Sequence, residues 1–393
     1  MAVLVINSGS SSIKYQVVDP VSGQSLASGL VEQIGLPSGH VKHEHGEDVR
    51  EWEGPIPNHE VGMEKVLEFF DAAGPSLHDG SIKAVGHRVV QGGKYFNKAA
   101  LLDEATINRI DELAPLGPLH NPPALEGINV AKRLLPDVPH VAVFDTAFFQ
   151  SLPEEAARYG LNREIADKYE IRRYGAHGTS HMFVSQAASA FLGRDDLKQI
   201  VLHIGNGASV SAVVNGHAVE TSMGLTPLEG LVMGGRTGDI DPAAVFHLYR
   251  VAGMSIDEID NLFNRKSGMM GLCGSSDLRD VHAMVREGNK EAKEAVDVYA
   301  HRIVKYIGAY TATMGGLDCI TFTAGVGEND NIMRAEVLNR LASFGVKYDE
   351  EKNNTRSKEA RDIATEDSKI RILIIPTNEE LAIARQVTEL VEG

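Results

Sequence analysis

The sequence predicts an α/β protein made of two duplicated domains. Residues 3–18 read as a strand, a turn of Gly and Ser, and a second strand, because an apolar run (VLVI) precedes the turn and an alternating apolar and polar run (IKYQV) follows it. Residues 200–214 repeat this order near the middle of the chain. Short apolar runs also alternate with segments of helical periodicity in the rest of the sequence, which is typical of α/β folds.

The two hairpins align with each other. Superposing Gly9 on Gly207 aligns the turns, and each copy continues into a further strand-like run. Chance similarity of two hairpins is the alternative, but a separation of nearly half the chain favours duplication. Two such hairpins facing each other across a cleft would grip a polyphosphate from both sides.

The first turn has the composition of an anion site. Gly9 lacks a Cβ, so the backbone N–H groups around it can approach a ligand closely. Successive N–H groups in such a turn form an anion-binding nest, and Lys14 adds a positive charge. A Walker P-loop is excluded because a strand follows the turn where that motif needs a helix. An ordinary Ser-rich hairpin is the alternative to phosphate binding.

Composition limits the classes of function. The chain has 393 residues, enough for two or three domains, and a net charge of −16, which argues against a nucleic-acid surface. Cys273 and Cys319 are its only cysteines, so a disulfide framework is excluded and a reducing, cytoplasmic setting is expected. We expect no signal peptide, because residues 1–6 lack a basic n-region and their apolar run is too short, and no apolar run in the sequence approaches membrane-spanning length.

Two charged residues stand at the ends of predicted strands. Arg88 lies near the end of residues 82–90, beside a Gly pair, and its planar guanidinium suits carboxylate and phosphate oxygens, although a surface arginine is the alternative. Asp145 directly follows the buried-type run 140–144. Ligands of α/β sheets lie beyond the carboxyl ends of strands, so Asp145 has the position of a catalytic or metal-linked carboxylate, or else caps the next turn.

The histidines do not have the spacing of a metal site. Residues 37–57 are polar and contain a group of three histidines, and we expect a solvated loop there because no ligand spacing is recognisable. His177 and His181 are four residues apart, but Gly178 stands where a zinc HExxH motif has Glu. We therefore expect His177 to act as an electrophile rather than as a zinc ligand.

Glycine-rich segments mark two further candidate sites. Residues 221–242 are dense in Gly and Pro and carry Arg236, which indicates the edge of a substrate site. Residues 325–329 (GVGEN) are expected to form a glycine turn against which a flat base would lie. Glu379 and Glu380 stand at the start of the last predicted helix. Their negative charges interact favourably with the helix dipole there, and a carboxylate that binds magnesium is the functional alternative.

At this point the motifs resemble those of a known family, the acetate kinases. The matching segments, in order along essentially the whole chain, are NSGSSSIKY, HRVV, FDTAFF, YGAHGTSH, HIGNGAS, MGGRTGDIDP, SSDLR, GVGEN and TNEEL. The resemblance implies the actin-like fold that acetate and sugar kinases share with heat-shock ATPases: two duplicated α/β domains with a cleft between them. It places an acyl-side domain at 1–148, completed by a helix at 380–393, and a nucleotide-binding domain at 149–379.

The implied activity is reversible transfer of the γ-phosphoryl group of ATP to acetate, which gives acetyl phosphate and ADP. The family uses Mg²⁺ or Mn²⁺, so this cofactor is expected here, with small molecules as partners and no nucleic acid or membrane. A cytoplasmic homodimer is the family expectation. Phosphoryl transfer leaves the protein little covalent chemistry, so positioning and charge stabilisation dominate.

The resemblance also assigns site residues. The expected catalytic residues are Asp145, His177 and Arg236. The expected substrate-binding residues are Arg88, Val90, Leu119, Ala176 and Pro227. The expected ATP-binding residues are Lys14, His203, Ile204, Gly205, Asn206, Gly207, Asp277, Leu278, Arg279, Gly325, Val326, Gly327, Glu328 and Asn329. The expected metal-binding residues, partly through water, are Asn7 and Glu379.

Each catalytic residue has an implied role. Arg88 would hold the acetate carboxylate, and Arg236 would neutralise charge on the moving phosphoryl group. His177 would donate to an equatorial oxygen of the transition state. Asp145 would orient the acetate or act through Mg²⁺, since a carboxylate is already a competent nucleophile.

The sequence departs from the family pattern at the acid pocket. Ala176 stands where the family usually has Phe, which leaves more room beside the acid, so propionate is a possible alternative substrate. Gln91 stands where the family commonly has His. An actin-like or chaperone ATPase is a second alternative, but those proteins use Asp where Asn7 stands and would leave His177 and Arg236 without a role.

Overall fold

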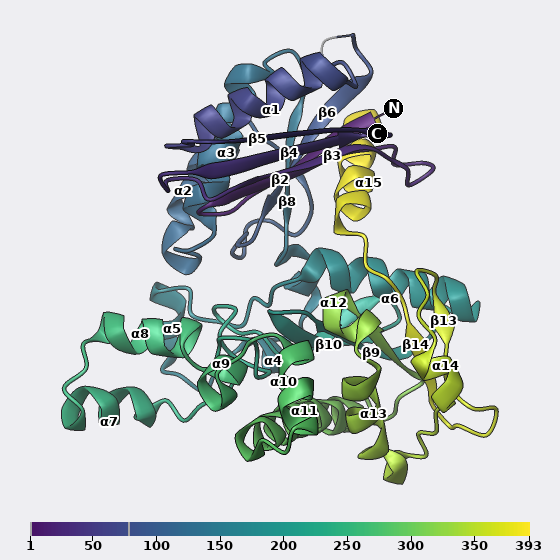
Figure 1. The fold of residues 1–393 in the computed structure, drawn as a ribbon. Helices are drawn as coiled ribbons and strands as arrows, with labels where there is room; N and C mark the ends of the chain where they lie inside the picture. The colour runs from purple at the N-terminus through teal and green to yellow at the C-terminus, as the bar shows by residue number, and fades with distance from the viewer. Residues whose placement is uncertain (1, 78) are drawn as a thin grey trace. The chain divides into compact units, whose positions relative to one another are not determined.

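The computed structural model describes residues 2–77 and 79–393. The chain forms two compact units: unit 1 is Met1–Gln150 with Asn378–Gly393, and unit 2 is Ser151–Thr377. The division expected from the sequence, 1–148 with 380–393 and 149–379, differs from these limits by two residues at each boundary. Each unit contains its own sheet (Figure 1).

The sheet of unit 1 is mixed, in the order β5-β4-β3-β2-β1-β6-β8-β7. Its strands are β1 (Ala2–Ser8), β2 (Ser12–Val18), β3 (Ser25–Glu32), β4 (Gly39–His45), β5 (Asp48–Gly54), β6 (Ile82–Val89), β7 (Ala100–Leu101) and β8 (His140–Phe144). β1 pairs antiparallel with β2 on one side and parallel with β6 on the other, and β6 pairs parallel with β8. The predicted hairpin is therefore confirmed and lies at the centre of the sheet.

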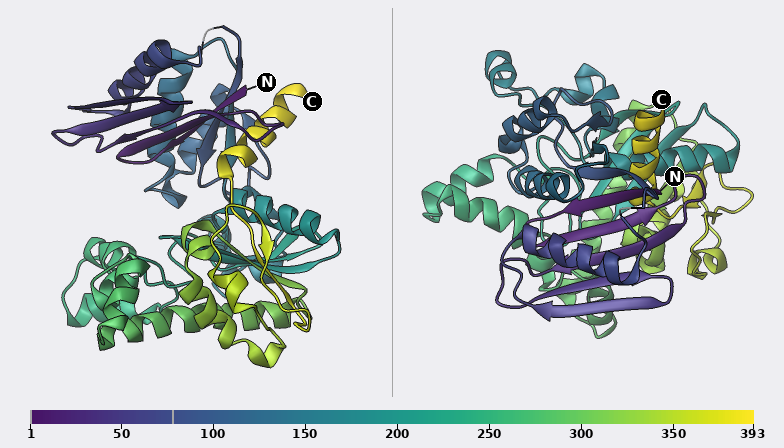
Figure 2. Two further views of the ribbon diagram at one scale, coloured as in Figure 1. Left: turned by 45° about the vertical axis from the view of Figure 1, so that its right-hand side comes forward. Right: turned by 90° about the horizontal axis from the view of Figure 1, so that it is seen from above.

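Helices pack on both faces of this sheet. The helical segments of unit 1 are α1 (His59–Ala73), α2 (Glu104–Glu112), η1 (Ala114–Leu116), α3 (Asn121–Leu134) and α15 (Glu379–Glu392), with η2 (Ala147–Ser151) at the boundary. Leu4 and Ile6 of β1 share an apolar core with α1 and α3. Val3 and Gly86 face α15 instead, as the period of two along a strand requires. Figure 2 shows α15, in yellow, beside this sheet from two further directions.

Unit 2 repeats the pairing pattern of unit 1. Its sheet has the order β11-β10-β9-β12-β14-β13. Its strands are β9 (Lys198–Ile204), β10 (Ala208–Val214), β11 (His217–Thr221), β12 (Cys319–Thr323), β13 (Arg361–Asp362) and β14 (Arg371–Ile374). β9 pairs antiparallel with β10 and parallel with β12, β12 pairs parallel with β14, and β13 closes the sheet antiparallel, as β7 does in unit 1. This common topology confirms the predicted duplicated α/β fold.

Helices also cover both faces of the unit 2 sheet. They are α4 (Glu154–Ala157), α5 (Arg163–Lys168), α6 (Gly178–Leu192), α7 (Ala243–Val251), α8 (Ile256–Arg265), α9 (Gly268–Cys273), α10 (Leu278–Arg286), α11 (Lys290–Thr313), α12 (Ala324–Asn329), α13 (Asn331–Asn339), η3 (Ala342–Phe344) and α14 (Glu350–Asn354). α11 shares a core with Ile200 and Leu202, while α6 lies on the other face, where Gln199 donates to the Ser185 carbonyl at 3.2 Å. Within residues 2–77 and 79–393, no helix is both long and apolar enough to cross a bilayer.

The structure corrects the expected loop at 37–57. This segment forms β4 and β5, and the side chain of His43 is fully buried. His43 Nε2 donates to the Gly74 carbonyl at 2.9 Å, and the Tyr15 hydroxyl lies 2.8 Å from His43 Nδ1. The strand pattern was missed because these partners, which make burial of a polar histidine tolerable, are distant in sequence.

The expected glycine turn at 325–329 is also wrong, because this segment forms the short helix α12. The Glu328 carboxylate accepts the backbone N–H of Ala324 at 2.9 Å and so satisfies a donor at the start of the helix. It also accepts the Thr377 N–H at 3.1 Å. The hydrogen-bond acceptor for the start of this helix is thus a side chain of the segment itself, whereas the glycines of the segment had indicated a turn.

The contact of α15 with β6 makes a stability prediction for unit 1. A Cβ on Gly86 would lie 2.8 Å from the Cγ2 atoms of Ile383 and Val387, and such β-branched side chains in a helix are stiff. Gly86→Ala should therefore lower the free energy of unfolding of unit 1 by about 1–3 kcal/mol. The sole tryptophan, Trp52, lies in β5, so its fluorescence in urea reports unit 1.

Gly160→Ala is the control for this prediction, since an added Cβ there would meet no atom within 4 Å. Its Trp52 unfolding curve should match that of the parent protein. An unchanged urea midpoint for Gly86→Ala would contradict the proposed overpacking between β6 and α15.

Candidate active site

Unit 1 brings several predicted site residues together at one edge of its sheet. Asn7 lies in β1, Arg88 near the end of β6 and Asp145 directly after β8. Because β1, β6 and β8 run parallel, their carboxyl ends meet at this edge. Glu379 joins them as the first residue of α15, which Asn378 caps by accepting the Leu381 N–H at 2.9 Å.

Arg88 is the centre of this group. Its Nε and Nη2 donate to Asp145 Oδ2 at 3.1 and 2.5 Å, and its Nη1 donates to Asn7 Oδ1 at 3.4 Å. Glu379 Oε2 lies 4.0 Å from Arg88 Nε. Burial opposes the charge of Arg88, but Asp145 and Glu379 raise its pKa above the usual range. Arg88 is therefore a fixed cation held by a fully buried carboxylate.

The carboxylates of this group outnumber its cations. Asp145 and Glu379 lie beside Arg88, and Glu380 forms an ion pair with Lys14, whose side chain is 60% exposed. Burial raises the pKa of Glu379; Arg88 lowers it, and Asp145 and Glu380 raise it further. The negative charge of the carboxylates at this edge of unit 1 thus exceeds the positive charge of Arg88 and Lys14.

Unit 2 gathers three histidines and two serines between α6 and its sheet. Ser209 and Ser211 lie on the same face of β10, His181 lies on α6 and His203 is near the end of β9. His177 precedes α6 with a left-handed φ of 60°, and its ring stacks on that of His203 with centroids 4.2 Å apart. His177 Nδ1 lies 2.9 Å from Ser209 Oγ.

Arg236 points to the same place as His177. A Cβ built on Gly207 would lie 3.6 Å from His177 Nε2 and 3.9 Å from Arg236 Nη1. Arg236 Nη1 donates to the Pro227 carbonyl at 3.3 Å, and burial lowers the pKa of Arg236. In the described part of the chain no carboxylate forms an ion pair with this guanidinium. The space beside Gly207 is therefore lined by two nitrogen groups suited to an anion.

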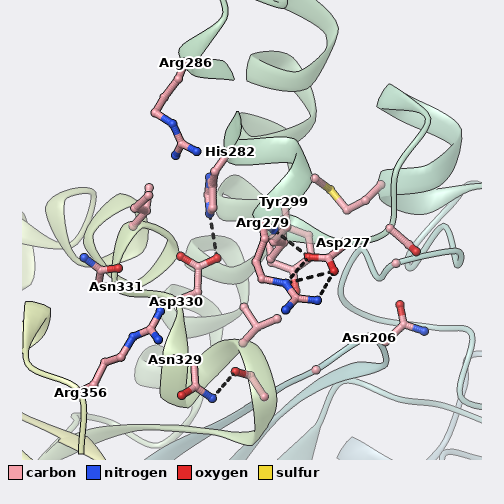
Figure 3. Close-up of a pocket in the computed structure, with 18 residues that line it drawn as sticks. Asn206, Asp277, Arg279, His282, Arg286, Tyr299, Asn329, Asp330, Asn331 and Arg356 are labelled. Atoms are coloured by element: carbon pink, nitrogen blue, oxygen red, sulfur yellow. Dashed lines mark hydrogen bonds and ion pairs between the residues drawn. The ribbon is translucent and has the colours of Figure 1, made fainter. Parts of the chain in front are cut away.

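A pocket of about 760 Å³ opens in unit 2. Figure 3 shows its lining, which comes from the β9–β10 turn, from α9 to α13 and from loop residues that include Gly234 and Arg356. The Asp277 carboxylate accepts the Arg279 backbone N–H at 2.9 Å and pairs with the Arg279 guanidinium at 2.5 Å, and these hydrogen bonds lower the pKa of Asp277 to about 2. His282 and Asp330 form a second pair at 2.8 Å. The volume is within the range of small-molecule and cofactor sites.

Most of the expected ATP-binding residues line this pocket. They are Gly205, Asn206, Asp277, Leu278, Arg279, Gly325, Val326 and Asn329. Others do not line it: His203, Ile204, Gly207, Gly327 and Glu328 lie elsewhere in unit 2, and Lys14 belongs to unit 1. Lining residues that the sequence did not single out include His282, Arg286, Tyr299, Asp330, Asn331 and Arg356. The first three lie on α10 and α11, Asp330 and Asn331 are at the start of α13, and Arg356 lies in the loop after α14; no local motif marks them.

The residues expected around the acid are divided between the units. Val90 follows β6 and Leu119 is 46% exposed, both in unit 1, whereas Ala176 and Pro227 belong to unit 2. Ala176 is 2% exposed within the unit 2 core, and Pro227 contacts Arg236 through its carbonyl.

Gln91 folds back onto its own chain. Its Oε1 accepts the Gly93 N–H at 2.9 Å, and only 4% of the residue is exposed. Its backbone is held by Asn121, which accepts the Gln91 N–H at 3.1 Å and donates to its carbonyl at 2.9 Å. Gln91 therefore stabilises the loop after β6.

Sequence reasoning missed His181, Ser209 and Ser211 as parts of the site. The four-residue spacing of His177 and His181 was a signal, but it pointed to a metal. Among the described residues, no group of three or more His, Cys, Asp or Glu side chains has the arrangement of a metal site. The partners of these histidines are instead hydroxyl groups, which sequence spacing does not reveal.

Known proteins are similar to this chain over nearly its whole length. The acetokinase family profile matches residues 2–385. An acetate kinase of Leifsonia xyli subsp. xyli is 50% identical over 392 residues, 99% of each chain. The crystal structure of Porphyromonas gingivalis acetate kinase has a TM-score of 0.94 and 40% identity, with 99% of both chains covered. A propionate kinase structure from Francisella tularensis subsp. tularensis SCHU S4 has a TM-score of 0.93 and 39% identity, with 98% of both covered. The chain belongs to the acetokinase family.

Proposed function

We propose that this protein is an acetate kinase, which transfers the γ-phosphoryl group of ATP to acetate and catalyses the reverse reaction from acetyl phosphate and ADP. Its family and its relatives named acetate kinase support this proposal. The observation that carries it in the structure is Arg236, a partly buried guanidinium that faces the space beside Gly207 together with His177 Nε2.

The chemistry of phosphoryl transfer fits these two groups. Negative charge in the transition state is spread over the equatorial oxygens of the transferred group, so fixed donors and cations stabilise it. Arg236 offers donors and a charge, and His177 offers a ring nitrogen in the same space. Neither group needs to take a proton from the acceptor, because a carboxylate is already a nucleophile.

Unit 1 supplies the features expected for the acid. The guanidinium of Arg88 has the geometry to bind a carboxylate, and Asp145 holds it in place through two hydrogen bonds. Asp145 is fully buried and bonded to Arg88, so its first role in this proposal is to orient that cation. Val90 and Leu119 provide apolar surface on the same unit.

The donors at the edge of unit 1 fit Mg²⁺. Asn7 and Glu379 carry oxygen ligands, and the excess of carboxylates over cations around Glu379 favours an added positive charge. Mg²⁺ is usually held by one or two carboxylates together with phosphates and water, so a cage made of protein ligands alone is not required. When bound, the ion would neutralise charge on the phosphate oxygens.

We also propose a cytoplasmic homodimer. The two cysteines are both free thiols, which agrees with a reducing compartment. α7 and α8 expose large apolar side chains, including Phe246, Tyr249 and Ile256, and such exposure is typical of surfaces that associate.

Trapping of the product tests the activity. Purified protein with ATP, Mg²⁺, hydroxylamine and acetate should form acetyl hydroxamate at a rate that depends on the acid and is lost with EDTA. Arg236→Ala should lower kcat by about 100-fold or more, because it removes a transition-state cation. Arg340→Ala is the matched control, since Arg340 pairs with Asp297 and Glu336 away from the site. ATP turnover without hydroxamate would indicate an ATPase of the same fold instead.

A second prediction concerns the nucleotide pocket. Gly325 lines the pocket, and a Cβ there would meet no atom within 4 Å, so a larger side chain projects into open space. Gly325→Leu should weaken binding of Mg·ADP by about tenfold or more through steric exclusion, with unchanged thermal stability. Gly160→Leu, equally open but outside the pocket lining, should bind Mg·ADP as the parent protein does. Equal affinity in the two variants would place the nucleotide elsewhere.

Propionate kinase activity is the second candidate function. Ala176 replaces a side chain that is usually Phe in the family, and the propionate kinase of Francisella tularensis shares the fold at 39% identity. A smaller side chain beside the acid would accept a longer acyl chain.

Ala176→Phe should shift the ratio of kcat/KM for acetate over propionate upward by about tenfold or more, because one methylene in an apolar pocket is worth about 1–3 kcal/mol. Since Ala176 is only 2% exposed, thermal unfolding and Ala176→Val are measured alongside. The smaller Val should give an intermediate ratio. An unchanged ratio in folded Ala176→Phe would remove Ala176 as the determinant of chain length.

A further inference from the structure

A chain of hydrogen bonds leads from His177 into the interior of unit 2. His177 Nδ1 lies 2.9 Å from Ser209 Oγ, and Ser209 Oγ lies 2.7 Å from His181 Nε2. His181 Nδ1 in turn lies 2.7 Å from Ser211 Oγ. His181 and both serines are fully buried, so exchange of their partners with water is restricted.

The number of protons in this chain limits how it can be arranged. Burial and the nearby His203 hold the pKa of His181 well below its usual range, so the ring is neutral, with one N–H and one acceptor nitrogen. Each serine has a single O–H. The Ser209 oxygen could accept from both rings, but its own buried O–H would then have no acceptor among the described residues, which is unfavourable. If the Ser209 hydroxyl donates to one of the two rings and His177 is neutral as well, all the hydrogen bonds run in one direction, either from Ser211 toward His177 or from His177 toward Ser211.

The buried end of the chain distinguishes these directions. If the bonds run from Ser211, its hydroxyl donates to His181 Nδ1, His181 Nε2–H donates to Ser209, and the Ser209 hydroxyl donates to His177 Nδ1. In the opposite direction Ser211 accepts from His181, and its own proton needs another acceptor. The described residues offer Ser211 Oγ no partner besides His181. A buried hydroxyl without an acceptor is unfavourable, so the first direction is preferred.

We propose that Ser211, His181 and Ser209 form a positioning relay that fixes the tautomer of His177 with its proton on Nε2. In this tautomer the Nε2–H group of His177 faces the space beside Gly207, where Arg236 Nη1 also points. The other tautomer would present a lone pair to an anionic oxygen and repel it. The inference deepens the proposed function, since it rests on His177 as a donor to the transferred group, and it assigns His181 a positioning role that needs no metal.

The tautomer of His177 is measured directly by long-range ¹H–¹⁵N correlation spectra of the ¹⁵N-histidine-labelled protein. The His177 signals are assigned by their loss in His177→Asn. We expect an Nε2–H tautomer in the parent protein. Ser211→Ala removes the terminal donor, so the Nδ1–H tautomer of His177 should gain population. kcat should then fall by about tenfold, while the KM for ATP changes by less than about twofold.

Two further variants separate positioning from a general structural effect. Ser185→Ala removes another buried hydroxyl, which donates to the Met182 carbonyl outside the relay, and should leave both the tautomer and kcat unchanged. Ser211→Thr keeps the hydroxyl and should restore the Nε2–H tautomer. If Ser211→Ala does not fold, the proposal is tested by the His177 tautomer of the parent protein and of Ser211→Thr, which should be Nε2–H in both.

An Nδ1–H tautomer in the parent protein would overturn the proposal, and so would an unchanged tautomer and kcat in folded Ser211→Ala. The kinase assay is independent of this result. An Nε2–H tautomer without acyl hydroxamate would support the relay and contradict the proposed function, whereas hydroxamate with an Nδ1–H tautomer would do the reverse.

Discussion

The pairing of one central strand, antiparallel on one side and parallel on the other, organises both units. In unit 1 this strand is β1, and in unit 2 it is β9. A Gly-containing turn joins the central strand to its antiparallel partner. The parallel strands have their carboxyl ends at the same edge of the sheet as this turn. Each turn therefore lies beside strand ends, where backbone N–H groups and charged side chains meet. Arg88 and Asp145 reach the Gly9 side of unit 1 for this reason, and the Gly207 turn of unit 2 contributes to the pocket through Gly205 and Asn206.

The buried arginines of the two units, Arg88 and Arg236, have different surroundings. Arg88 has Asp145 beside it, so its charge is compensated and its direction is fixed before a ligand binds. The guanidinium of Arg236 has only the Pro227 carbonyl and the Met233 sulfur as hydrogen-bond partners among the described residues. A partly buried charge without an opposite charge is unfavourable, and burial accordingly lowers its pKa. An anion that binds there recovers this free energy, which makes Arg236 a stronger indication of an anion site than the paired Arg88.

The sequence was informative where a site residue follows directly from its own strand or turn. Asp145 stands after an apolar run and Gly207 within a hairpin, so local pattern was enough to predict their positions. It was uninformative where the conformation or burial of a residue depends on hydrogen-bond partners that the local pattern does not show. The burial of His43 is tolerable because Tyr15 and Gly74 form hydrogen bonds with its ring, and the helix at 325–329 is supported by Glu328, which accepts the backbone N–H of Ala324 at its start. The family resemblance supplied roles for single residues but not the hydroxyl partners of His181, which depend on β10 lying against α6.

Arg236 and His177, the two nitrogen groups beside Gly207, differ in what makes them hydrogen-bond donors. A guanidinium has five N–H donors and no acceptor, so Arg236 presents a donor in every rotamer. An imidazole has no such constraint, because each ring nitrogen either donates or accepts according to the tautomer. The tautomer of His177 therefore depends on Ser209 and His181. Each of these side chains has one proton for the chain, so it donates on one side when it accepts on the other. The last member, Ser211, contacts neither the pocket nor Arg236, yet its single hydrogen bond decides which nitrogen of His177 carries the proton. A polar group in the interior can thus determine the chemistry of a site that it does not touch.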